Sequence, residues 1–143
     1  MAESLQILDS SFSEWVVRNF SDDLEKKDCE LLRRIAEAVS FSFSIKHTCL
    51  DFSVYKDIGE PLVLELLSGI KPKDVQRIIT PAVKPLVASE DGSRVWLQKY
   101  YLFDQCVAQK LQVMRNEGRL QIITGGPGTG KTYSVLQLVA DHF

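Results

Sequence analysis

Residues 125–132 read Gly-Gly-Pro-Gly-Thr-Gly-Lys-Thr, and this run constrains the chain more than any other feature of its sequence. The run fits the pattern G-x-x-x-x-G-K-[ST] through Gly125, Gly130, Lys131 and Thr132. This pattern is typical of a loop whose backbone N–H groups surround a phosphate, because glycines let successive amides curve without Cβ clashes. It therefore predicts a loop that joins a buried strand to a helix.

The segments on both sides of the loop carry the matching patterns. Upstream, the apolar residues Leu120, Ile122 and Ile123 predict a buried strand. Downstream, apolar residues recur at helical spacing, at Val135, Leu136, Leu138 and Val139. They predict a helix that begins near Gly130, so strand, loop and helix follow in the required order. A glycine-rich turn that fits by chance is the alternative interpretation, and these flanking patterns disfavour it.

The residue types of the loop indicate a site for ATP with Mg²⁺. Lys131 would contact the β- and γ-phosphates, and the hydroxyl of Thr132 would ligate the Mg²⁺ ion that bridges them. The N-terminus of the following helix adds partial positive charge. Lys131 and Thr132 are thus the predicted catalytic residues. The whole loop is predicted to bind the nucleotide, namely Gly125, Gly126, Pro127, Gly128, Thr129, Gly130, Lys131 and Thr132.

Charge is distributed unevenly along the 143 residues, whose formal net charge is −2. Residues 1–70 carry 7 basic and 13 acidic side chains, a net of −6. Residues 71–143 carry 10 and 6, a net of +4. This asymmetry favours an acidic docking module followed by a segment that tolerates polyanions, although shifts of this size also occur in ordinary proteins.

The cysteines and the N-terminal segment indicate a cytoplasmic protein. Cys29, Cys49 and Cys106 are odd in number and widely spaced, which argues against a disulfide framework and favours buried, reduced thiols. His47 lies near Cys49, but no second ligand pair follows at zinc spacing. The N-terminal stretch is acidic, whereas a signal peptide would have a basic start followed by an apolar run. No apolar stretch approaches the about 18 residues that span a bilayer, so no membrane partner is expected.

The first half of the chain predicts helices. Ser11 and Glu14 have the spacing of a capping box before a short helix that runs to Phe20. Asp22 and Glu25 would cap a longer second helix. Its apolar stripe consists of Leu24, Leu31, Leu32, Ile35, Ala38 and Val39. The stripe favours packing inside this chain over docking on a partner, and Glu30 and Arg34 are predicted to pair on the exposed side.

The middle of the chain is punctuated by proline and glycine. Residues 40–55 favour no single element. Pro61 predicts the first turn of a short helix that Gly69 closes, and a further helix is predicted over 74–79. Apolar runs on both sides of Asp91-Gly92 predict a β-hairpin over 86–97.

A linking helix is predicted over 99–115, which Gly118 ends. The predicted fold class is therefore a mainly α N-terminal module with a small β-hairpin, followed by the first strand, loop and helix of an incomplete P-loop α/β domain. The predicted parts are a helical interaction domain over 1–84, the hairpin and linking helix over 85–118, and the start of an ATPase or helicase motor domain over 119–143.

The stretch from Pro85 to Thr132 resembles the RecD-type DNA helicases of superfamily 1, the alpha subunits of exodeoxyribonuclease V. The residues that carry the resemblance are Pro85-Leu86-Val87, Asp91-Gly92, Val95-Trp96-Leu97-Gln98-Lys99-Tyr100-Tyr101, Gln105, Ala108 and Ile122 to Thr132. A shorter likeness lies at His47-Thr48-Cys49-Leu50-Asp51. Only the last third of the chain carries a specific likeness.

The resemblance implies an ATP-driven motor that moves along single-stranded DNA within a helicase and exonuclease complex for recombinational repair of double-strand breaks. The N-terminal domain would contact the other subunits of this RecBCD-like complex. The family also uses a glutamine upstream of the loop to recognise adenine, because a carboxamide can both donate and accept hydrogen bonds. Gln105 is the first candidate for that role, and Gln109 and Gln112 compete with it.

Two departures from the family pattern stand out. Tyr133 replaces the small hydroxyl residue usual after the loop, which leaves Lys131 and Thr132 intact. The chain also lacks the later motor motifs, and a lone strand over 120–124 would expose an unpaired edge. We therefore expect an N-terminal piece of a larger ATPase, inactive by itself.

Two other functions remain open. The chain could be a helical protein-interaction fragment with a vestigial nucleotide loop. It could also belong to a hexameric remodelling ATPase or a small-molecule kinase, since both carry loops of this type.

Overall fold

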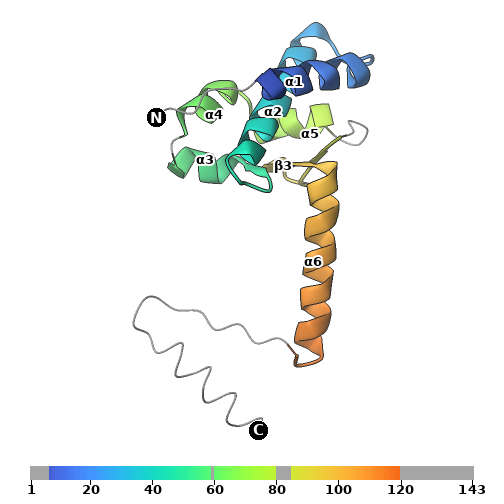
Figure 1. Cartoon of the computed structure of the whole chain (residues 1–143). Coiled ribbons are helices and arrows are strands. Elements are labelled where there is room, and N and C mark those ends of the chain that lie inside the picture. Colours follow the sequence, from blue (N-terminus) through green and yellow to red (C-terminus); the bar gives the residue numbers. More distant parts are fainter. Residues whose placement is uncertain (1–6, 59, 80–84, 120–143) are drawn as a thin grey trace. The chain divides into compact units, whose positions relative to one another are not determined.

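A computed structural model describes residues 7–58, 60–79 and 85–119 of the chain (Figure 1). The described part is mainly helical, with one small antiparallel sheet of three strands. The elements in order are α1 (Ile7–Phe20), α2 (Lys26–Ser44), β1 (Leu50–Asp51), α3 (Phe52–Ile58), α4 (Pro61–Leu66), α5 (Pro72–Ile79), β2 (Leu86–Ala88), β3 (Arg94–Leu97) and α6 (Gln98–Asn116). The chain divides into two units, Met1–Asp104 and Gln105–Phe143, and α6 runs from the first into the second.

Helix α1 is present as predicted, but its predicted start is wrong. It already includes Ile7, so Ser11 and Glu14 lie inside the helix and cannot form a capping box at its N-terminus. The nearby Ser13 makes a hydrogen bond inside the helix, where its hydroxyl donates to the carbonyl oxygen of Ser10 at 2.9 Å. The spacing of Ser11 and Glu14 fits a cap, but local spacing alone does not show where a helix begins.

Helix α2 confirms the predicted apolar stripe from Leu31 to Val39, whereas Leu24 precedes the helix. Leu32, Ile35, Ala38 and Val39 are buried, and Leu24 and Leu31 pack against the core. Glu25 holds the N-cap position, but neither its side chain nor that of Asp22 provides the predicted cap, since the N-cap side chain makes no hydrogen bond to the helix.

The predicted pair of Glu30 and Arg34 is wrong. Glu30 pairs with Arg33, whose Nη2 lies 2.6 Å from Oε1 of the carboxylate. Arg34 reaches the end of α4 instead, where it donates to the carbonyl oxygens of Ser68 at 2.7 Å and Glu65 at 3.3 Å. Arg34 therefore joins α2 to the C-terminal end of α4, where a basic side chain can donate to the last carbonyl oxygens of a helix.

Residues 40–55 form three elements that the sequence did not distinguish. Helix α2 continues to Ser44, and Lys46 then adopts a left-handed conformation with φ of 74°. The two-residue strand β1 follows. Asp51 then accepts hydrogen bonds from the N–H of Ser53 at 2.9 Å and from its hydroxyl at 2.5 Å, which satisfies the start of α3.

The two predicted helices of the middle region are confirmed. Pro61 occupies the first turn of α4, and Gly69 turns the chain after it with φ of 76°. Helix α5 begins at Pro72, two residues before the predicted start. There the carboxylate of Asp74 accepts the N–H of Lys71 at 3.0 Å, which satisfies one free donor of the first turn.

Strand β3 is the central strand of the sheet, with the order β1-β3-β2. The predicted hairpin is confirmed, because β2 and β3 are antiparallel and place Leu86 opposite Leu97, Val87 opposite Trp96 and Ala88 opposite Val95. Strand β1 pairs with the other edge of β3, where Leu50 lies opposite Val95. Asp51 lies opposite Arg94 and accepts its Nε–H at 2.7 Å.

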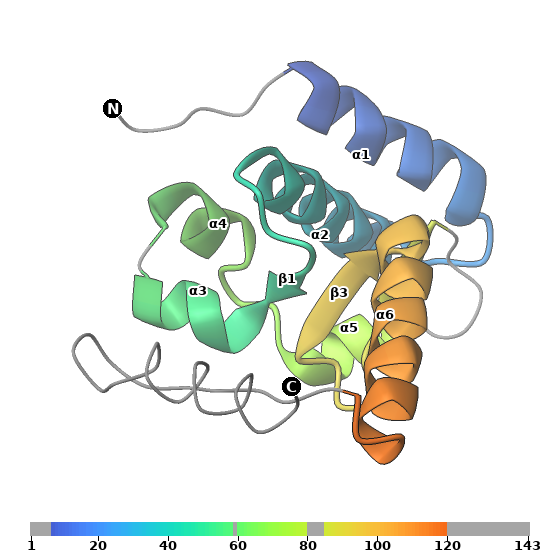
Figure 2. The ribbon, with the colours of Figure 1, turned by 60° about the horizontal axis from the view of Figure 1, so that its bottom comes forward.

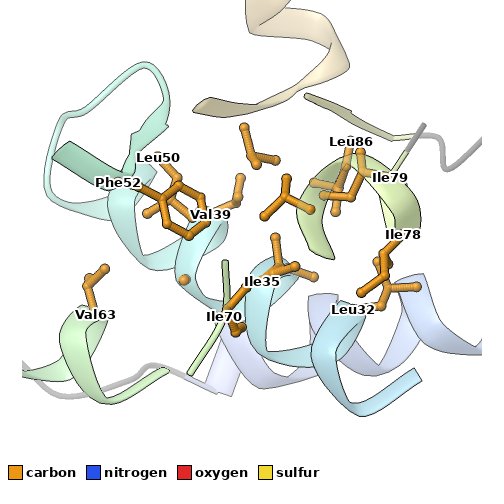
Figure 3. Packing of buried hydrophobic residues seen from close by; sticks show 14 of the residues in the cluster. Leu32, Ile35, Val39, Leu50, Phe52, Val63, Ile70, Ile78, Ile79 and Leu86 are labelled. Carbon is orange, nitrogen blue, oxygen red and sulfur yellow. The ribbon is translucent and has the colours of Figure 1, made fainter. Parts of the chain in front are cut away.

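Helix α2 is the centre of the first unit and contacts α1, α4, α5, β1 and β3 (Figures 1 and 2). Its buried side chains meet those of the surrounding elements in one apolar core, part of which is drawn in Figure 3. The fully buried apolar residues include Val16, Leu32, Ile35, Ala36, Ala38, Leu50, Val63, Val75 and Val95.

Charged side chains tie the elements around this core. Arg77, in the last turn of α5, donates to both carboxylate oxygens of Asp28 in the first turn of α2. These hydrogen bonds lower the pKa of Asp28, although its desolvation opposes the shift. Between α1 and α2, the hydroxyl of Ser40 donates to the buried Asp9 at 2.6 Å, and that of Ser10 donates to the buried Glu37 at 2.8 Å.

The carboxylate of Asp91 organises the hairpin turn and makes its stability depend on pH. It accepts the hydroxyls of Ser89 and Ser93 and the N–H of Ser93, and these bonds lower its pKa from 3.8 to about 2. A carboxylate with a lowered folded-state pKa stabilises the fold fully above its unfolded pKa, and this stabilisation is lost as the pH falls through the folded-state pKa.

We therefore expect Asp91→Asn to lower the unfolding midpoint in urea at about pH 6 and to have little effect near about pH 2. Unfolding would be followed by circular dichroism across this range. Asp22→Asn, an exposed change in the α1–α2 turn, is the matched control. A difference between wild type and Asp91→Asn that stays constant with pH would contradict the expectation.

The rest of the predicted fold stays a prediction. The strand, loop and helix expected over 120–143 lie outside the described residues. The division into 1–84, 85–118 and 119–143 also stays a prediction. In the described part, hairpin β2–β3 shares a sheet with β1 and lies in the first unit.

Candidate functional site

The phosphate-binding loop predicted from Gly125 to Thr132 lies outside the described residues. This applies to Lys131 and Thr132, the predicted catalytic and Mg²⁺-binding residues. The described residues of the candidate site are those of α6 and the turn after it, up to Arg119. The geometry of this helix therefore determines which of the predicted adenine-contacting residues share a face.

Helix α6 begins directly after β3, and a glycine turn ends it. Gly118 has φ of 69°, and its N–H donates to the carbonyl oxygen of Arg115 at 3.1 Å. The N–H of Arg119 donates to the carbonyl oxygen of Met114 at 2.8 Å. This pair of bonds is the Schellman motif, in which a glycine takes the left-handed conformation and the chain turns off the helix. The sequence prediction that Gly118 ends this helix is confirmed.

The three candidate glutamines lie on one side of α6. Gln105, Gln109 and Gln112 have the spacing i, i+4 and i+7, so they project from neighbouring positions. All three side chains are exposed. Exposure leaves each carboxamide free to contact a ligand, and it is also the ordinary state of a glutamine on a helix surface.

Beside the glutamines, α6 lines a groove of about 480 Å³. Among the described residues, the lining consists of Cys106, Gln109, Lys110, Val113, Met114 and Arg119. The first five follow the spacing i, i+3, i+4, i+7 and i+8, which places them on one face of the helix. A second groove, of about 510 Å³, is lined by Ala108, Gln109, Gln112 and Val113. Gln109 and Val113 therefore line both grooves.

The described end of the site carries more positive than negative charge. Lys110, Arg115 and Arg119 are exposed, and the only acidic side chain from Gln105 to Arg119 is Glu117, which forms an ion pair with Arg119. Sequence reasoning did not single out Lys110 or Arg119. The helical spacing of Lys110 from Cys106 and Val113 could have indicated that Lys110 shares their face. Gly118 could have indicated that the chain turns off the helix at Arg119.

The three cysteines differ in environment, and the prediction that they are buried is wrong for Cys106. Cys106 is exposed on α6, whereas Cys29 and Cys49 are partly buried, and all three thiols are free. Burial raises the pKa of Cys49. Like the other residues of α6, Cys106 is not buried.

The described residues include neither a metal-binding group nor a membrane-spanning helix. Within 7–58, 60–79 and 85–119, no group of three or more His, Cys, Asp or Glu side chains could hold a metal ion. The ring of His47 packs edge-on against that of Tyr55, with ring centroids 5.6 Å apart. In the same part of the chain, none of the helices combines the length and apolar character needed to cross a bilayer.

Comparison with known proteins gave no match, whether with protein-family models, with curated proteins or with solved structures.

Proposed function

We propose that this chain is the N-terminal part of a RecD-like ATP-dependent DNA helicase subunit, which binds ATP and Mg²⁺ through the loop Gly125 to Thr132. The observation that carries the proposal is the complete phosphate-binding pattern, flanked by an apolar run and a helical pattern. The hairpin β2–β3 and helix α6 support it, because they are the elements in which most of the other residues of the resemblance lie.

Each residue of the loop has a defined task in this proposal. The glycine-rich backbone binds the phosphates, Lys131 contacts the β- and γ-phosphates, and Thr132 holds the metal. Mg²⁺ would offset the negative charge that develops during phosphoryl transfer. In the complete protein, the free energy of ATP hydrolysis would drive movement along single-stranded DNA. This movement would take place in a cytoplasmic helicase and exonuclease complex that repairs double-strand breaks. The N-terminal domain would contact the other subunits.

A second candidate function is a helical protein-interaction fragment with a vestigial nucleotide loop. The observation that favours it is a set of exposed apolar side chains on α1. Ile7 is 89% exposed, Leu8 70% and Trp15 49%. An interaction fragment would bind its partner equally well with and without ATP, and Lys131→Ala would not change that binding.

Lys131→Ala tests the first candidate. We expect the change to weaken ATP binding by about ten- to a hundredfold, because it removes a charge-assisted hydrogen bond to the phosphates. Calorimetric titration of the chain with Mg·ATP would measure this loss. Lys73→Ala, an exposed change on α5, is the matched control and should bind as wild type does.

The same substitution in the complete subunit separates the two candidates. Lys131→Ala should abolish ATP hydrolysis stimulated by single-stranded DNA and leave assembly with the other subunits intact. Unchanged hydrolysis would refute the motor function. Assembly that requires ATP would count against the interaction fragment.

A further inference from the structure

Helix α6 carries an exposed apolar stripe along most of its length. The helix is continuous from Gln98 to Asn116 (Figure 1), and none of its residues is buried. The stripe consists of Phe103, Val107, Leu111 and Met114, which are 65%, 40%, 43% and 36% exposed. Their spacing keeps them on one face of a straight helix, because eleven residues make about three turns. A contiguous apolar face of this kind indicates a contact surface.

We infer that this stripe is the contact surface of a dimer, in which the α6 helices of two copies of the chain pair antiparallel about Val107. Such a contact needs only α6 and not the loop Gly125 to Thr132, so it goes beyond the proposed function. Three features of α6 favour it, namely the symmetry of the stripe, the sizes of its side chains and the charges beside it.

The stripe is symmetric about Val107, which is the midpoint of α6, nine residues from each end. Tyr100 extends the stripe at its N-terminal end, so apolar residues lie four and seven positions on each side of Val107. A two-fold axis through Val107 places Tyr100 opposite Met114 of the second copy. It also places Phe103 opposite Leu111 of the second copy and overlaps the two helices over their full length. An isologous dimer needs a self-complementary surface of this kind.

The sizes of the side chains favour the antiparallel arrangement. Phe103 meets Leu111, and Tyr100 meets Met114, whose thioether makes favourable contacts with an aromatic ring. The ring of Tyr100 also stacks on that of Phe43, with ring centroids 4.5 Å apart, which limits the side-chain entropy that docking would cost. A parallel pair would instead put all the rings at one end, and the smaller side chains at the other end would fill the gap less well.

The charges beside the stripe are complementary in the antiparallel pair. Asp104 and Arg115 lie on the same flank of α6, since they are eleven residues apart. Asp104 of one copy and Arg115 of the other are about 7.5 Å apart along the helix axis, and the two-fold axis forms this ion pair twice. On the other flank, Lys99 lies closer along the axis to Glu117 of the second copy than to its Lys110. Opposite charges at such flanking positions stabilise paired helices and set their direction.

Substitutions of two valines on α6 test the contact surface. Val107→Asp places two carboxylates together on the two-fold axis, so we expect it to weaken dimerisation of the whole chain by about tenfold or more. Val113→Asp is the matched control, because Val113 is 51% exposed on the same helix and lies about 120° around the axis from Val107. Sedimentation velocity over a range of protein concentrations would measure both variants. Circular dichroism would check that both keep the helix content of wild type.

Reversal of charges tests the direction of the pair. In the antiparallel pair, Arg115→Asp sets a carboxylate against Asp104 of the second copy, so we expect dimerisation to weaken about three- to tenfold at low ionic strength. Adding Asp104→Arg to the same chain restores opposite charges and should restore the wild-type affinity. In a parallel pair, Arg115 would lie beside Lys110 of the second copy, so Arg115→Asp would strengthen dimerisation.

Self-association of the wild-type chain is the first result required. We expect a dissociation constant of about 1–100 μM, because one pair of helices makes a small interface. A chain that stays monomeric up to about 1 mM would overturn the inference. A dimer that Val107→Asp weakens no more than Val113→Asp does would overturn the contact surface, and strengthening by Arg115→Asp would overturn its direction. None of these outcomes alters the proposed function, which Lys131→Ala tests separately.

Discussion

Replacing Gly92 with alanine is expected to lower the free energy of unfolding by about 2–4 kcal/mol. Gly92 lies in the turn of hairpin β2–β3 with φ of 70°, a left-handed conformation that disfavours side chains. A Cβ there would overlap the carbonyl oxygen of Pro72 and lie 2.9 Å from Cγ of Gln76. The alanine must therefore push the turn away from α5, and the side-chain bond from Gln76 to the carbonyl oxygen of Glu90 would be strained.

Gly69→Ala is the matched control for this prediction. Gly69 has φ of 76°, but a Cβ at this position would meet no atom within 4 Å. The control therefore carries only the backbone penalty, about 1 kcal/mol. Urea unfolding of both variants would measure the difference between them, which reports the steric overlap with Pro72. Equal losses in the two variants would show that the hairpin turn does not pack against α5 as described.

Leu32→Ala is expected to cost about 2–5 kcal/mol of unfolding free energy. Leu32 lies on α2, is completely buried, and belongs to the core cluster together with Ile35 and Ile78 (Figure 3). The substitution removes buried apolar area and leaves a cavity, because the rigid helices around it collapse only in part.

Leu102→Ala controls for the change of residue type. Leu102 is also helical, on α6, and is 59% exposed, so its loss should change stability by less than about 0.5 kcal/mol. Chemical denaturation of the two variants would give the comparison. A cost at Leu102 equal to that at Leu32 would contradict the burial of Leu32 in the core of the first unit.

Elements whose signals are local could be predicted from the sequence. The apolar stripe of α2 repeats at helical spacing, and it is the stripe that the core buries. The hairpin follows from Asp91-Gly92 between two apolar runs, because the turn needs a residue that tolerates positive φ. The end of α6 follows from Gly118 for the same reason. In each case the physical reason for the element lies in a few neighbouring residues.

Ion pairs and caps were predicted less well, because their partners are chosen across the fold. Spacing allows Glu30 to pair with Arg34, but Arg34 donates to the carbonyl oxygens of Glu65 in α4 and of Ser68 in the turn after it, and Arg33 takes the carboxylate. Asp28 and Arg77 are 49 residues apart, and no local pattern links them. The pairing of β1 with β3 is similar, since a strand of two residues has too little pattern to be recognised.

The candidate site also combines features that the sequence shows with features that only the structure shows. The sequence by itself determined the phosphate-binding pattern at Gly125 to Thr132, because this pattern depends on residue type and on spacing along the chain. The three candidate glutamines were implied by the resemblance and not by spacing. Only the tertiary structure decided which of those glutamines shares a groove with Cys106, Val113 and Met114, and that Arg119 returns to the end of the helix. The physical reason is that a groove is a property of a folded surface, where helix register and the turn at Gly118 bring together side chains that the linear sequence keeps apart.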